Sequence, residues 1–469
     1  MRTPMMRAWQ IIRRILEWIG IAVGAVVLLA LVLFGVAYVI NSHDEALTTQ
    51  AQTLLVQPPN PYSAEENIYL TLVGFDAPSG QSPTAVGRLR IEHYNQNVDR
   101  ALRGPALEMR DILNPKDPRR LEFRGDFDFI QPFDSYWSVI PPHRLTVERL
   151  LTDNRELYER YRALLRQRGY FATARPSPLA PTGSLASGVR TLFLADVVLR
   201  MRSDDPQRQR EGLADLESDV QLWRAELTGE GPLISHLIAT AYLHQDQSVL
   251  ADIIADPRAP IPTGAADADA VAPLFALADW DLSGAYREES RFRDAVLQQV
   301  HFASEAPPVL AGQGRMQRWL DRIGSHFLKL NATENLFAAQ ARQLMRAAAP
   351  GAAREIPVPD WTLRLAYNPL GKVLAWLGVR AQADYRARAW DGAAYQRLVR
   401  LSYEIRRQRI LPAGIPAFMR GHPQWSTHPD DGRPFLWDEK GKTLRVQNLS
   451  GSRPGTSFLV HVWMEPSGG

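Results

Sequence analysis

The chain contains no cysteine among its 469 residues. A disulfide framework, a thiolate nucleophile and a Cys-ligated zinc or iron–sulfur site are therefore excluded. The absence does not fix the compartment, because both a reducing cytoplasm and a periplasm tolerate such a chain. Hydrophobic residues make up 45% of the sequence, which is enough for packed cores, so we expect a folded protein rather than a disordered one.

The sequence also lacks the short motifs that mark common catalytic sites. It contains no G-x-S-x-G elbow, P-loop, GxGxxG or S-x-x-K pattern. The closest helical pair of histidines, His236 and His244, would lie about 12 Å apart along a helix, which is too far for one metal ion. We therefore expect neither a cofactor nor a metal site.

Positive charge is in excess only at the N-terminus. Of the 54 basic and 51 acidic residues, one glutamate and four arginines precede the long apolar run, namely Arg2, Arg7, Arg13 and Arg14, so the rest of the chain is formally neutral. Binding to nucleic acid needs a basic face that neutralises phosphates. No basic block interleaved with aromatic residues follows, and we expect no nucleic-acid partner.

The one long apolar run covers residues 18–40, which are 23 residues without a charge. About 20 apolar residues suffice to cross the hydrocarbon core, whereas the apolar region of a cleavable signal peptide usually has roughly 7 to 15. We therefore favour an uncleaved transmembrane helix over a signal peptide, for which residues 35–37 would offer a cleavage site. Trp18 and Tyr38 lie where interfacial aromatic residues belong.

The charges around this run predict its orientation. Arginines precede it, while Asp44 and Glu45 follow it, so the positive-inside rule places residues 1–17 in the cytoplasm and the bulk of the chain outside. In a bacterium this predicts a single-pass inner-membrane protein with a periplasmic body, and the lipid bilayer is its first partner. Gly20 and Gly24 form a GxxxG spacing that would let two anchors pack as a homodimer, although small residues are common in membrane helices.

Helical periodicity interrupted by Pro and Gly dominates residues 42–420, the predicted periplasmic all-α domain. Residues 184–203, 206–229 and 231–255 predict three antiparallel helices with short connections. Further helices are expected at residues 143–168, 270–302, 314–348 and 369–409. The pattern predicts a mainly α fold, an α-hairpin array or helical bundle, although no clean repeat is present.

Residues 103–141 form an irregular segment rich in proline and aromatic residues within this helical body. Loops of that length are uncommon unless they are functional or flexible, so this segment is the first place to look for a site. Asp126, Asp128 and the nearby His143 are its candidates for catalytic residues. A simpler interpretation of the alternating acids and phenylalanines is that the acids face solvent between packed rings.

Residues 421–469 change to a strand-like pattern and predict a small β-rich cap. Residues 435–437 and 443–446 predict a hairpin, and residues 458–463 supply a third strand. Asp430 and Asp431 are expected to initiate a turn before Gly432.

Residues 429–437, with the sequence PDDGRPFLW, resemble the D-P-(W/F)-G-x-P-(Y/L)-x-Y segment that opens the C-terminal strands of type II secretion pseudopilins. Two departures limit what the resemblance implies. Glu17 precedes the apolar run instead of lying within it, and residues 447–453 lack the acids of the pseudopilin calcium site. Neither calcium binding nor pilus assembly is therefore carried over. In its anchor and helical layout the chain is similar to uncharacterised single-anchor bacterial envelope proteins, which implies no activity.

These features together predict a protein that acts through protein contacts, as a scaffold or accessory subunit of an envelope complex. A neutral body of helical hairpins favours concave protein-binding surfaces. The alternative is an envelope-modifying hydrolase with a cleft beside residues 121–141, which would need two carboxylates that face each other. A pocket with convergent acids near that loop would favour the enzyme, whereas a groove along the hairpins would favour the binding protein.

Overall fold

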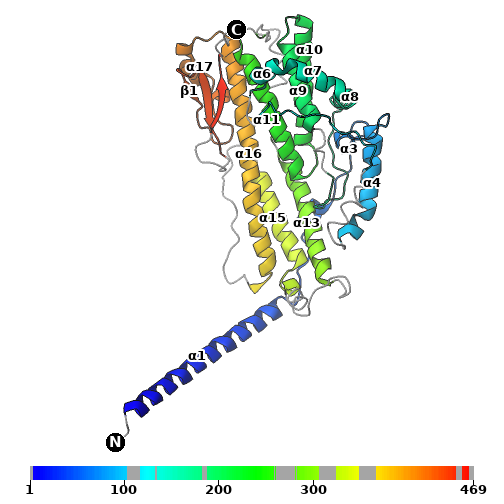
Figure 1. The fold of residues 1–469 in the computed structure, drawn as a ribbon. Helices are drawn as coiled ribbons and strands as arrows, with labels where there is room; N and C mark the ends of the chain where they lie inside the picture. The colour runs from blue at the N-terminus through cyan, green and yellow to red at the C-terminus, as the bar shows by residue number, and fades with distance from the viewer. Residues whose placement is uncertain are drawn as a thin grey trace. The chain divides into compact units, whose positions relative to one another are not determined.

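The computed structural model describes residues 4–102, 117–131, 135–181, 187–257, 259, 280, 282–305, 324–347, 366–449 and 457–463. Over these residues the protein is mainly helical, with one small antiparallel sheet (Figure 1). The chain divides into two compact units. Unit 1 comprises Met1–Gln52, Val300–Ala339 and Pro357–Gly378, and unit 2 comprises Thr53–Gln299, Gln340–Ile356 and Val379–Gly469.

Unit 1 begins with α1 (Pro4–Ile40), which contains the apolar run. Pro4 is the first residue of this helix, a position where the missing N–H of proline is not needed. Residues Leu16–Ile40 have a mean hydropathy of 2.9, and none of the span is buried. One N-terminal helix is therefore long and apolar enough to be a membrane anchor or a signal sequence.

Two further helices begin in unit 1, α15 (Leu330–Ala347) and α16 (Pro369–Arg407). The first N–H groups of a helix have no partner within the helix and favour a nearby carboxylate. Asp44 supplies it for α15, because its carboxylate accepts hydrogen bonds from the backbone N–H groups of Asn331 and Ala332 at 2.9 and 3.1 Å. The residues that follow α1 are thereby bound to a helix far along the chain.

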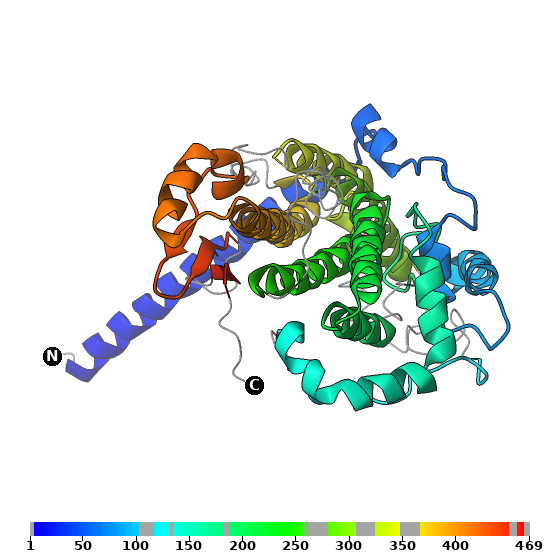
Figure 2. The same cartoon turned by 90° about the horizontal axis from the view of Figure 1, so that it is seen from above.

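Three consecutive helices, α9 (Ser187–Met201), α10 (Pro206–Thr228) and α11 (Leu233–Ala255), form the centre of unit 2. α10 packs against both of the others, and Figure 2 shows the green helices side by side. Asp205 caps α10 by accepting a hydrogen bond from the backbone N–H of Gln207 at 2.8 Å. These bounds agree with the prediction for residues 184–255, but three packed helices do not establish a repeating array.

The other elements of unit 2 surround this centre. α3 (Ile68–Val73) crosses α4 (Pro83–Leu102) so closely that a Cβ on Gly87 would lie 1.8 Å from the carbonyl oxygen of Leu70, so the crossing requires glycine. The helix predicted after His143 is instead divided at Asn154 into α7 and α8. In the described residues these helices are α2 (Thr49–Leu55, which unit 1 shares), α3 (Ile68–Val73), α4 (Pro83–Leu102), α6 (Tyr136–Val139), η1 (Pro141–His143), α7 (Arg144–Asp153), α8 (Arg155–Leu164), α13 (Ser283–Glu305, whose end belongs to unit 1), η5 (Pro412–Gly414), α17 (Ile415–Gly421) and α18 (Pro423–Ser426).

Parts of several predicted segments lie outside the described residues. They are Arg2 of the N-terminal segment, residues 103–116 and 132–134 of the irregular loop, residues 184–186, 270–279, 281, 314–323 and 348 of predicted helices, and residues 450–456 and 464–469 of the predicted cap. The described parts of the helices predicted at residues 270–302 and 314–348 correspond to α13 and α15.

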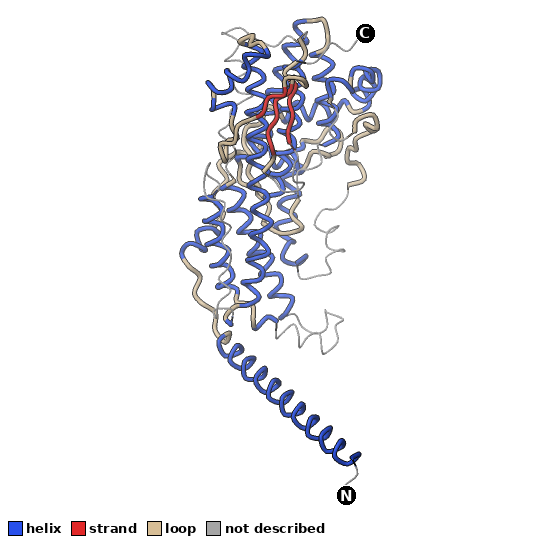
Figure 3. Tube along the Cα trace, turned by 90° about the vertical axis from the view of Figure 1, so that its left-hand side faces the viewer, coloured by secondary structure: helices blue, strands red, loops and turns tan. Residues whose placement is uncertain are grey.

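The sheet contains β1 (Leu436–Asp438), β2 (Thr443–Gln447) and β3 (Ser457–His461) in the order β1-β2-β3, all antiparallel (red in Figure 3). Its register places Leu444 opposite both Trp437 and Val460. Leu444 and Val460 are buried, so one face of the sheet belongs to the core. The predicted hairpin and third strand are confirmed.

Candidate functional site

The predicted catalytic candidates lie on the surface of unit 2. Phe129 stacks on His143 with ring centroids 4.2 Å apart, and Phe127 stacks on Phe123 at 5.7 Å. Asp126 and Asp128 are exposed, while the phenylalanines pack against the core. In the described residues no hydrogen bond or ion pair joins either acid to His143. Acids and phenylalanines therefore alternate in this segment because the acids face solvent while the rings pack against the core.

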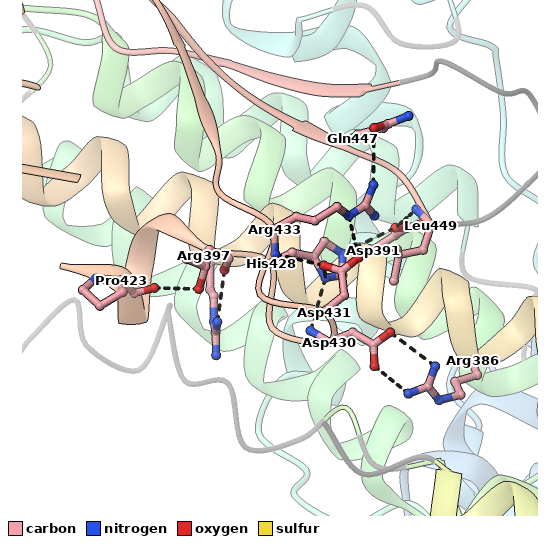
Figure 4. A network of polar contacts seen from close by, with 11 residues as sticks. Arg386, Asp391, Arg397, Pro423, His428, Asp430, Asp431, Arg433, Gln447 and Leu449 are labelled. Carbon is pink, nitrogen blue, oxygen red and sulfur yellow. Dashed lines mark hydrogen bonds and ion pairs between the residues drawn. The ribbon is translucent and has the colours of Figure 1, made fainter. Parts of the chain in front are cut away.

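Asp430 and Asp431 belong to a polar network around the buried His428, in which Asp430 is buried and Asp431 is exposed (Figure 4). Asp430 is 5% exposed and accepts two hydrogen bonds from the guanidinium of Arg386 on α16, at 2.5 and 3.3 Å. Asp431 accepts a hydrogen bond from the backbone N–H of Arg433, and Gly432 between them has a φ of 71°. The predicted turn is present, and Asp430 in addition fixes it to α16.

His428 lies at the centre of this network with a fully buried side chain. Its Nδ1 accepts the backbone N–H of Asp430 at 3.2 Å, and its Nε2 lies 3.8 Å from the carboxylate of Asp391. Asp391 also accepts the backbone N–H of Leu449 at 2.6 Å. A histidine beside carboxylates resembles an acid–base site. Because a substrate cannot reach an enclosed ring, the network acts as a structural link between the sheet segment and α16.

A second buried network joins α9, α10 and α11. Arg190 is 1% exposed and pairs with Asp219, at 3.0 Å, and with Asp246. Burial disfavours the Arg190 charge, but Asp246 and Asp219 outweigh burial and raise the pKa of Arg190. Burial raises the pKa of Asp246. The three residues come from three helices and show no sequence pattern, so sequence reasoning missed them.

The best candidate for a binding site is a cavity of about 300 Å³ in unit 2. It lies between residues 171–181, called here the proline strap, the start of α11, and α13. Its lining is mostly apolar and includes Tyr69, Pro176, Pro178, Pro181, Pro232 and Phe292. Ligand pockets typically measure roughly 300–1,000 Å³, so this one suits one or two amino-acid side chains or a small molecule.

Side chains hold the proline strap in place. Asn67 is fully buried and binds both backbone groups of Phe171, donating to its C=O at 2.9 Å and accepting from its N–H at 3.1 Å. Asn95 in the same way binds the C=O of Thr173 and the N–H of Arg175, at 3.0 and 2.8 Å. Buried backbone needs hydrogen-bond partners. These amides replace a neighbouring strand and give the cavity a fixed wall.

Glu288 on α13 is the acidic side chain of the cavity lining and is 3% exposed. Its Oε2 accepts two hydrogen bonds from Arg291, at 2.8 and 2.5 Å. Burial raises the pKa of Glu288, and Arg291 opposes the rise. Oε1 has no hydrogen-bond partner in the described part of the chain and is left as an acceptor. The site therefore combines mostly apolar walls with one acidic side chain.

No family model matches this chain, and no curated protein or solved structure matches it either. The described residues form a mainly helical protein with one N-terminal apolar helix and one candidate binding cavity. Its function has to be argued from its own geometry.

Proposed function

We propose that this protein is a single-pass bacterial inner-membrane protein with a periplasmic body, which acts through protein contacts as a scaffold or accessory subunit of an envelope complex. The observation that carries the proposal is the cavity beside the proline strap. Protein interfaces concentrate their binding energy in a few large side chains that fill apolar pockets. An apolar side chain of the partner fills the cavity, and an N–H beside it donates to Oε1 of Glu288.

A retained anchor is supported by Asn41, the first residue after α1, which is 0% exposed. Its side chain donates to the carbonyl of Ala366 at 2.5 Å and accepts the backbone N–H of Asn368 at 2.8 Å. Chain termini are usually poorly ordered unless they are tied down. Cleavage after residue 37 would place a new charged terminus within one helical turn of this buried amide, which favours an uncleaved helix.

The hydrolase alternative has weaker support. Such an enzyme needs two carboxylates that face each other across a cleft. Asp126 and Asp128 are both exposed beside packed rings, and the carboxylate of Glu288 is bound by Arg291. Binding of a partner's apolar side chain, by contrast, needs only the cavity and its present lining.

Photo-crosslinking in the native membrane tests the proposal. A benzoylphenylalanine at Ile234, a half-exposed residue of the cavity lining, should capture one discrete envelope protein. The same probe at Leu411, which is more exposed but does not line the cavity, is the matched control and should not capture it. Filling the cavity by Ala174→Trp should abolish the product. Equal capture at both positions would reject the cavity as the binding site.

A further inference from the structure

Four large apolar side chains form an exposed stripe on the first turns of α16. Leu370, Val373, Leu374 and Leu377 are 41%, 38%, 38% and 54% exposed. Their spacing of three, one and three residues places them on one face of a helix. A single exposed leucine is ordinary, but a contiguous apolar patch marks an interaction surface. We call these four residues the α16 stripe; all belong to unit 1.

Hydrogen bonds tie the start of the stripe to the outer end of α1. The backbone N–H of Asn368, two residues before Leu370, donates to Asn41 at 2.8 Å. The backbone N–H of Leu370 donates to the carbonyl of Phe327 at 3.4 Å. The stripe therefore starts beside the end of the apolar helix.

Aromatic contacts extend this connection onto the helix itself. The Phe327 ring lies 5.7 Å from the ring of Phe34, and the His326 ring stacks on Tyr38 at 3.7 Å. Phe34 and Tyr38 both belong to α1, within Leu16–Ile40. Residues 326–327 thus lie against the last turns of the apolar span.

Helix geometry gives the depth of these contacts. The 25 residues of Leu16–Ile40 are about 37 Å long, whereas the hydrocarbon core is about 30 Å thick. Phe34 lies six residues before the end of this span, which is about 9 Å along the helix. In a centred span Phe34 is inside the hydrocarbon. A ring that contacts Phe34 therefore enters the outer leaflet as well.

We propose that Phe327 and the α16 stripe form a second membrane contact, an apolar surface that lies against the outer leaflet beside α1. The inference rests on the anchoring proposed above. The occupant of the stripe is lipid, because the hydrogen bonds that Asn41 makes with Ala366 and Asn368 hold the start of the stripe at the bilayer surface. Apolar side chains at that level meet headgroups and acyl chains and bind by burial of their apolar area.

Spin labelling of the full-length chain tests this contact, and the absence of native cysteine makes each single-cysteine variant free of background. Leu370→Cys and Leu377→Cys are labelled in vesicles of phosphatidylethanolamine and phosphatidylglycerol. Leu145→Cys and Leu411→Cys, at unit 2 leucines that are 81% and 76% exposed, are the controls. Collisions with oxygen, relative to those with a water-soluble nickel chelate, should be several-fold more frequent at the stripe than at the controls.

Two results would overturn the proposal. Nickel access at the stripe equal to that at the controls would place the stripe in water. Low access to both reagents would mean that a protein surface, from a second copy or a partner, covers it. A label at Val27→Cys, in the middle of α1, distinguishes failure of the stripe proposal from failure of the anchor proposal. If α1 is the anchor, the label at Val27 is in lipid, whether or not the stripe is.

Discussion

At the scale of single residues, the main feature of the protein is its set of buried charged side chains. Arg190 neutralises carboxylates from two other helices, and its removal by Arg190→Met would leave Asp219 and Asp246 buried without a cation. Breaking a buried ion pair in this way costs about 3–5 kcal/mol. We expect a loss of that size in the free energy of unfolding, measured by urea titration of tryptophan fluorescence in detergent micelles.

The matched control for Arg190 is Arg144→Met. Arg144 pairs with Glu148 on the surface, with side chains 64% and 47% exposed. Exposed pairs contribute only about 0–1 kcal/mol, so this variant should unfold almost as the parent does. Similar losses in both variants would contradict the structural role of the Arg190 network.

Glu226 on α10 should make stability depend on pH. Burial raises the pKa of Glu226 from 4.5 to about 8, so the folded state keeps a proton that the unfolded chain releases. Its contribution is fully present below pH 4.5 and is lost as the pH rises through about 8. Glu226→Gln should remove this loss. Its advantage over the parent should grow between these limits to on the order of 3–5 kcal/mol.

Unfolding titrations at a series of pH values measure this effect. Glu159→Gln, a change at a residue with a 66% exposed side chain, is the control and should leave the slope unchanged. Parallel curves for the parent and Glu226→Gln would show that the buried carboxyl is not protonated.

At the scale of elements, the proline strap depends on Asn67. This residue caps α3 through Tyr69 and binds both backbone groups of Phe171. Asn67→Ala should leave those groups unpaired and lower the free energy of unfolding by about 2–3 kcal/mol. Hydrogen exchange should accelerate at the Phe171 amide. Asn97→Ala, which removes one bond to the His93 carbonyl, should not change exchange in the strap.

Elements with local signals could be predicted from the sequence. The limits of α10 follow from the Asp205 cap and a regular apolar stripe, and the hairpin of β1 and β2 follows from its strand pattern. The break at Asn154 could not be predicted, because Asn154 follows the apolar periodicity. The break coincides with hydrogen bonds to the backbone of Arg124, which is 30 residues away.

The cavity could not be predicted either, because it too depends on contacts between distant parts of the chain. Its wall joins residues from α3, the proline strap, α11 and α13, which lie far apart in the sequence. The partners of the strap are ordinary amides such as Asn67 and Asn95, and no local pattern distinguishes them from surface residues. The candidate acids Asp126 and Asp128 were found by a local pattern, and the structure gives that pattern a packing role.

At the scale of the whole molecule, the apolar helix was evident from the sequence, but the construction of unit 1 was not. Hydrogen bonds from Asn41 and Asp44 reach 327 and 287 residues along the chain. Three separate stretches of chain thus make one compact unit, whereas a sequence divides naturally only into consecutive segments.

The bonds of Asn41 lead to a prediction about processing. Intact mass spectrometry of the protein purified from its native membrane should show a chain that retains α1. A mature N-terminus at Tyr38 would show signal-peptide cleavage and would reject the anchor. Asn41→Ala is expected to retain α1 as well, with a mass that differs from the parent's only by the substitution, because the prediction depends on the length of the apolar run as well as on these bonds.

The tie at Asn41 also limits how the protein responds to bilayer thickness. A transmembrane helix in a thicker or thinner membrane adjusts by tilting or by sliding along the bilayer normal. In the proposed anchor, the outer end of α1 cannot slide independently, because its first following residue is bonded to Ala366 and Asn368. Hydrophobic mismatch would therefore be absorbed at the arginine-bearing end, where long side chains can extend to the headgroups, and the residues of unit 1 that follow α1 would keep their level relative to the outer leaflet.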